Sequence, residues 1–161
     1  MKYLLILFSL GCKLSFVQAQ NYFLRDGEYM DTATINDLSC PNLNYYYYHI
    51  GGKYPESSYT LLKKTQTFLK TSDKGFDSSG YITFRFLIEC NGKMMRKVQV
   101  LQTNDKYQSI YFDKQLVNLL FQFLTTLDKW KSPKSKEGAP ISYYAFLTFK
   151  IKDGKVCNVI P

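Results

Sequence analysis

Residues 81–101, YITFRFLIECNGKMMRKVQVL, constrain the fold of this chain more than any other stretch. Apolar and polar side chains alternate along its first limb, Asn91-Gly92 is a turn signal, and the alternation then resumes. This pattern predicts a β-hairpin. Since every second side chain of a strand shares a face, the buried face of the first limb is predicted to carry Ile82, Phe84, Phe86, Ile88 and Cys90.

The register of this hairpin follows from the burial of its second limb. A two-residue turn would set Lys97 opposite Phe86 and leave Val98 and Val100 facing solvent. A slip of one residue reverses that outcome. We therefore expect a loop of three or five residues with Gly92 in the left-handed conformation.

One helix is predicted before the hairpin and a second helix after it. Residues 55–70 begin with Pro55 and Glu56, which favour a first helical turn. The residues expected to repeat along one side of this helix are Tyr59, Leu62, Gln66 and Leu69. A second helix should start near Asp113 and end at Lys131-Ser132-Pro133, because a residue before proline avoids helical geometry. Its apolar stripe comprises Phe112, Leu116, Leu119, Leu120, Phe123, Leu127 and Trp130.

Residues 141–151 form the predicted final strand, which Asp153-Gly154 ends in a turn. Its inward side chains are expected to be Ile141, Tyr143, Ala145, Leu147, Phe149 and Ile151. The outward set, which includes two aromatic rings where charge would be usual, is Ser142, Tyr144, Phe146, Thr148 and Lys150.

The N-terminal segment has the features of a secretory signal. Lys2 precedes an apolar run, and cleavage is expected between Ala19 and Gln20, so residues 1–19 are predicted to be a signal peptide. The alternative is lipoprotein processing at Cys12, which would anchor the chain in a membrane. A spanning helix needs about 20 apolar residues, and no segment provides them.

Residues 20–52 have no sustained period and are predicted to be an irregular N-terminal arm, followed by one domain over residues 53–161. Within the arm, Tyr45 to Tyr48 are four consecutive tyrosines in the best strand candidate. They suit either a carbohydrate-stacking platform or a strand that packs alternate rings on the domain, and we favour the second.

Composition and charge limit the function. Removing Lys2 and Lys13 from the 21 basic residues leaves 19 against 13 acidic residues, a net charge of +6 that favours anionic partners. The lysines are scattered, so nucleic-acid binding is not expected. His49 is the only histidine, and it and the cysteines lack the spacing of metal or catalytic sites. We expect no enzyme activity, cofactor or metal.

The order helix, strand, turn, strand, helix, strand is accompanied by a set of spaced features. They are Gly80, Asn91-Gly92-Lys93, Val98, Val100, Leu127 to Lys131 around Trp130, Gly138-Ala139-Pro140 and Phe149-Lys150-Ile151. With these features the chain resembles the TonB C-terminal domain family over residues 51–155. The resemblance implies an α+β fold with two helices packed on one face of a three-stranded antiparallel sheet.

In that family the final strand lends its edge to a short segment of an outer-membrane receptor. The resemblance therefore predicts a periplasmic or secreted binding module of the bacterial cell envelope that engages a protein or peptide by strand addition. Its predicted partner-binding residues are Ser142, Tyr144, Phe146, Thr148 and Lys150. The membrane anchor and long proline-rich spacer of full transducers have no counterpart in this sequence, so energy transduction by this chain alone is not expected.

The alternative function is structural. In this second hypothesis the edge is covered by the tyrosine-rich arm or by a second copy, which makes the protein a structural or dimeric envelope component without a peptide ligand.

Export also bears on the cysteines, because three remain after processing and can form one bridge. If the last strand runs antiparallel beside the first, Cys90 and Cys157 lie ~33 Å apart, too far for a disulfide. We therefore predict that Cys40 pairs with Cys157 and that Cys90 is a core residue.

Overall fold

In the computed structural model, the described residues are 23–24, 27–29, 40, 44–70 and 75–161. The chain has an α+β fold. Its elements are, in order, β1 (Phe23–Leu24), β2 (Gly27–Tyr29), β3 (Asn44–Tyr46), α1 (Tyr47–Ile50), α2 (Ser58–Leu69), β4 (Gly80–Ile88), β5 (Met94–Thr103), α3 (Lys114–Thr125), β6 (Ser142–Lys152) and β7 (Lys155–Ile160).

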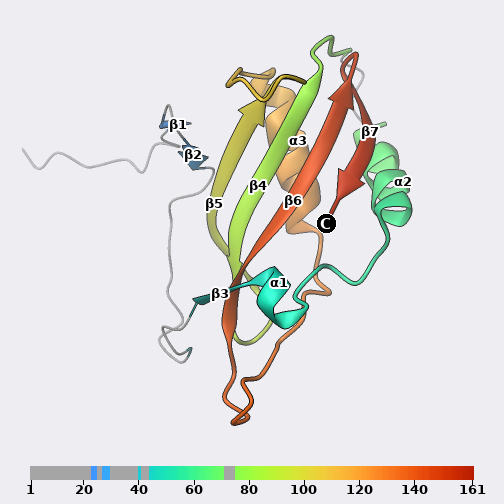
Figure 1. Cartoon of the computed structure of the whole chain (residues 1–161). Helices are drawn as coiled ribbons and strands as arrows, with labels where there is room; N and C mark the ends of the chain where they lie inside the picture. Colours follow the sequence, from blue (N-terminus) through green and yellow to red (C-terminus); the bar gives the residue numbers. More distant parts are fainter. Residues whose placement is uncertain (1–22, 25–26, 30–39, 41–43, 71–74) are drawn as a thin grey trace, which may run out of the picture.

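The sheet is larger than predicted. Strand β4 lies at its centre and pairs antiparallel with β5 and β6 (Figure 1). The full path is β1-β2-β5-β4-β6-β3, and β7 also pairs with β6. Strand β3 runs parallel to β6, which makes the sheet mixed. The three-stranded prediction is therefore wrong, because the added strands are too short or too irregular to produce a sustained alternation.

The hairpin has the predicted register. Phe86 pairs with Val98, and both side chains are buried, as is Val100. The amide of Glu89 donates to the carbonyl of Lys93, so three residues form the loop between them. Gly92 has φ of 81°, a left-handed conformation that favours glycine. The valine side chains are buried as expected, but the pairing shifts between Ile88, which is opposite Met94, and Phe86, so the loop alone does not set Phe86 opposite Val98.

The core lies between the sheet and helices α2 and α3. Aromatic rings join the layers: Phe123 of α3 contacts Phe149 of β6, and Phe68 of α2 contacts Phe123. The inward residues of β4 and β6 are buried as predicted. In Figure 1, α3 passes behind the strands, and the face toward the viewer carries no long helix.

Helix α3 begins as predicted but ends earlier. The Asp113 side chain caps it by accepting from the amide of Gln115 at 2.7 Å. The helix ends at Thr125, because the Thr125 and Thr126 hydroxyls donate to carbonyls of the last turn. Trp130 therefore lies beyond the helix, although it remains buried.

Helix α2 starts three residues later than predicted, and its core-facing side only partly coincides with the predicted stripe. Ser57 caps it, its hydroxyl accepting from the amide of Thr60. Leu61 and Thr65 are buried, whereas Tyr59 is 69% exposed. The buried Thr65 hydroxyl donates to the Leu61 carbonyl at 2.8 Å. This bond satisfies a polar group inside the core. Of the four predicted residues, Leu62 and Leu69 are half-buried and pack against the core cluster, so the predicted side is partly correct.

Candidate functional site

The five predicted partner-binding residues lie together on β6. Ser142 is buried, and Tyr144, Phe146, Thr148 and Lys150 are half-buried. Their side chains share the sheet face opposite the core, as their alternation with buried residues requires. The structure therefore brings these residues into one row.

The outer edge of β6 is covered over most of its length. Strand β3 pairs with residues 142–144, and β7 pairs with residues 148–152 after a tight turn at Asp153-Gly154. The prediction that β6 is the last strand and has a free edge is wrong. Among the described residues, only Ala145, Phe146 and Leu147 have no strand beside them on this side.

The N–H and C=O groups of Phe146 point away from β4, in the plane of the sheet, into this gap. The Glu89 amide, one residue past the end of β4, donates to the carbonyl of Lys93, one residue before β5. Residue 89 therefore faces the β5 side of β4, and the even-numbered residues of β4 face β6. Phe86 is opposite Ala145, so the odd-numbered residues of β6 face β4 and the even-numbered ones face outward. The Lys150 carbonyl supports this assignment, because it accepts a hydrogen bond from the Cys157 thiol of β7 and therefore faces the outer side of β6.

Aromatic side chains of the arm lie against the same part of β6. The Tyr46 ring is centred 5.9 Å from that of Tyr144, and the Tyr47 ring 5.8 Å from that of Phe146. On the other side of Tyr144, the Arg85 guanidinium is 4.4 Å from the ring centroid. Helix α1, which begins at Tyr47, lies beside the lower part of β6 (Figure 1).

The four tyrosines alternate in burial as predicted, but the predicted strand over Tyr45 to Ile50 is wrong beyond Tyr46, because residues 47–50 form helix α1. Tyr45 and Tyr47 pack against the core cluster, whereas Tyr46 and Tyr48 are 39% and 61% exposed. Sequence reasoning missed that two of these rings contact the predicted binding residues. The signal that could have found them was the run of four tyrosines itself.

A disulfide between Cys40 and Cys90 ties the arm to the hairpin loop. The predicted pairing of Cys40 with Cys157 is therefore wrong, and Cys157 is a free, exposed thiol on β7. The pairing depends on where the aperiodic arm crosses the domain, which spacing in the sequence does not encode. A disulfide indicates an oxidising compartment.

The other end of the arm is held by the segment after α3. The Lys131 ammonium donates to the Gly51 carbonyl at 2.8 Å, and the Tyr143 hydroxyl donates to the Lys131 carbonyl at 3.2 Å. A side chain at Gly52 would meet the Tyr143 ring at 2.5 Å. The arm is thus fixed on both sides of β3 and α1.

The buried Tyr143 side chain gives a pH-dependent prediction. Burial raises the pKa of Tyr143 from 10.0 to about 12. Its contribution to stability is complete below pH 10, where the phenol is neutral in both states, and is lost as the pH rises from 10 to 12. The loss is about 1.4 kcal/mol per pKa unit.

Tyr143→Phe removes this titration together with the hydrogen bond to Lys131. The variant should be less stable than the wild type by about 1 kcal/mol at neutral pH and more stable near pH 12. Urea unfolding at pH 7, 9 and 11 measures the difference. A difference that stays constant with pH would contradict the assignment.

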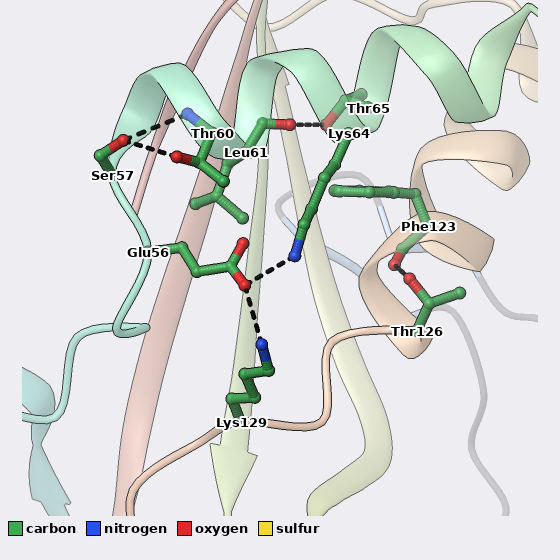
Figure 2. Close-up of polar contacts among 9 residues, drawn as sticks. All are labelled: Glu56, Ser57, Thr60, Leu61, Lys64, Thr65, Phe123, Thr126 and Lys129. Carbon is green, nitrogen blue, oxygen red and sulfur yellow. Dashed lines mark hydrogen bonds and ion pairs between the residues drawn. The ribbon is translucent and has the colours of Figure 1, made fainter.

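A second polar cluster, shown in Figure 2, connects α2 to the segment after α3. The Glu56 carboxylate accepts from Lys64 at 2.6 Å and from Lys129 at 3.4 Å. The hydrogen bond with Lys64 lowers the pKa of Glu56 and raises that of Lys64. Because both partners are lysines and the pairs join separate segments, we assign the cluster a structural role.

The described part of the chain has neither a candidate metal-binding group nor a membrane-spanning helix. It contains no group of three or more His, Cys, Asp or Glu side chains placed to hold a metal. His49 instead packs against the Tyr48 ring, with centroids 4.3 Å apart. Within the same residues, every helix is too short or too polar to cross a bilayer. The predicted cleavage between Ala19 and Gln20, and Cys12, lie outside the described residues.

No protein-family model matches the chain, and neither the curated proteins nor the solved structures include a match to it. The resemblance to the TonB C-terminal domain family therefore stays a prediction.

Proposed function

We propose that the protein is an exported binding module of the cell envelope that engages a protein or peptide by strand addition at the outer edge of β6. The observation that carries the proposal is the position of β3. This short strand already lies on that edge, in parallel register with residues 142–144. The main chain of β6 can therefore pair with a further strand at this edge. Beside β3, the peptide group of Phe146 points outward and has no strand next to it among the described residues.

Two further observations support a binding role outside the cytosol. The Cys40–Cys90 disulfide is typical of an oxidising compartment, which agrees with the predicted signal peptide. The resemblance to the TonB C-terminal domain family suggests a segment of an outer-membrane receptor as the partner. The aromatic and basic side chains beside the edge, Tyr144, Phe146 and Arg85, favour a protein surface over a catalytic reaction.

Proline substitution tests the edge. Phe146→Pro removes an outward amide and should leave the sheet folded, whereas Ala145→Pro removes an inward donor to β4 and should unfold it. Phe146→Ala is the matched control, because it removes the ring but keeps the amide. Relative to this control, Phe146→Pro should weaken partner binding by about 1 kcal/mol, or about fivefold.

The measurement is capture of the partner from an envelope extract by the chain from Gln20 onward, with folding followed by circular dichroism. If Phe146→Pro is folded and binds as well as Phe146→Ala, strand addition at this edge is refuted.

The second candidate is a structural envelope protein without a peptide ligand. The specific observation in its favour is that β3 and β7 together cover most of the outer edge of β6. In this case the chain captures no partner, and its arm stays in place. A gel-filtration mass of twice the chain mass would point to a homodimer instead.

A further inference from the structure

We propose that residues 44–50, here called the arm segment, act as an internal ligand of the β6 edge that a partner must displace. A partner that succeeds presents aromatic side chains at two consecutive positions, in place of Tyr46 and Tyr47. This inference rests on the proposed function, since it names the chemistry of the partner at the same edge.

The arm segment makes both kinds of contact that an added strand would make. Its β3 residues pair with residues 142–144 of β6 through the main chain. Its side chains then cover two predicted binding residues, with Tyr46 on Tyr144 and Tyr47 on Phe146. Main-chain pairing gives affinity and side-chain contacts give specificity in strand addition. The arm segment therefore has the properties of a ligand, not merely of a cover.

The chemistry of a competing peptide follows from these contacts. Tyr144 contacts both the Arg85 guanidinium, 4.4 Å from its ring centroid, and the Tyr46 ring, whose plane is inclined to it by 38°. Phe146 is half-buried, and Tyr47 packs against its edge with planes inclined by 61°. Such aromatic pairs stabilise a contact beyond the burial of their apolar surface. A peptide without rings at these positions cannot replace them.

The disulfide gives the arm segment its advantage over a free peptide. Cys40 is bonded to Cys90 only four residues before β3 begins, a span of at most ~14 Å. On the other side, Gly51 is bonded to Lys131. A ligand tethered this closely has an effective concentration on the order of millimolar. Opening the disulfide releases one end and should make displacement easier.

The test uses a labelled synthetic peptide with the sequence of residues 42–50 and fluorescence anisotropy with the full chain. A control peptide has serine in place of the second and third of its four tyrosines. Three proteins are compared: the oxidised wild type, Cys40→Ser/Cys90→Ser, and Tyr46→Ser/Tyr47→Ser. The last variant keeps the disulfide, so it answers the question even if the cysteine variant fails to fold.

We expect the tyrosine peptide to bind both variants at least about tenfold more tightly than the oxidised wild type, and the control peptide to bind at least about tenfold more weakly than the tyrosine peptide. Hydrogen exchange at the Tyr144 amide, which faces β3, should also be faster in both variants when it is measured without peptide. Equal affinity for the three proteins, equal affinity of the two peptides, or no binding to either variant would overturn the inference.

Failure of this inference differs from failure of the proposed function. If the peptide behaves as expected but no envelope partner competes with it, the internal ligand stands and the partner-binding function falls. If a captured partner depends on the Phe146 amide while the peptide binds all three proteins equally, the function stands and the internal ligand falls.

Discussion

Replacing Trp130 with alanine is expected to lower the free energy of unfolding by about 3 to 5 kcal/mol, as large aromatic deletions in protein cores do. Trp130 is only 7% exposed, and its ring packs edge-on against Phe86 and Tyr54 at centroid distances of 5.1 and 4.7 Å. Its removal would open a cavity between β4 and the segment after α3. Chemical denaturation followed by circular dichroism measures the loss.

Two controls show whether the loss arises from packing. Trp130→Phe should cost much less, because it keeps a ring in place and removes a buried Nε1 that has no hydrogen-bond partner among the described residues. Tyr59→Ala removes a ring that is 69% exposed and should change stability by less than about 0.5 kcal/mol. An unchanged midpoint for Trp130→Ala would mean that this side chain is at the surface.

Removing the disulfide has the second largest expected effect. Cys40 and Cys90 are 50 residues apart in the sequence. In the loop-entropy description, a cross-link that closes a loop of this size stabilises a fold by about 4 kcal/mol, chiefly by restricting the unfolded chain. Cys40→Ser/Cys90→Ser should therefore lose about that much stability in urea, and reduction of the wild type should have the same effect.

Cys157→Ser is the matched control, since it removes an exposed free thiol and should leave stability unchanged. Peptide mapping without reduction checks the pairing directly. A bridge that includes Cys157, or a cysteine double variant as stable as the wild type, would contradict the structure.

The hairpin and the final long strand were predictable because their information is local. Alternation identifies the inward side chains of β4 and β6, and the need to bury Val98 determines the register of β5. The start of α3 was predictable for the same reason, since the capping residue Asp113 is adjacent to the helical turn that it caps. Each of these predictions depends on residues fewer than about twenty positions apart, and the structure confirms each one.

The sides of the helices and the extent of the sheet were not predictable in the same way. The core-facing side of α2 is centred on the polar residue Thr65, whose hydroxyl bonds within its own helix, so the apolar pattern of the sequence located this side only in part. Strand β3 is three residues long and pairs in parallel with a segment almost one hundred residues away. Its tyrosines identified it as a strand candidate, but so short a segment does not encode which strand it pairs with.

The sequence by itself determined an α+β domain with a central hairpin, a long strand beside it and a row of candidate binding residues on that strand. Only the tertiary structure decided that the arm returns to this row, with its tyrosines on Tyr144 and Phe146 and its Cys40 bonded to Cys90. The physical reason is that periodicity records which side chains need burial, whereas the partner of a short strand is chosen by contacts between residues distant in the chain.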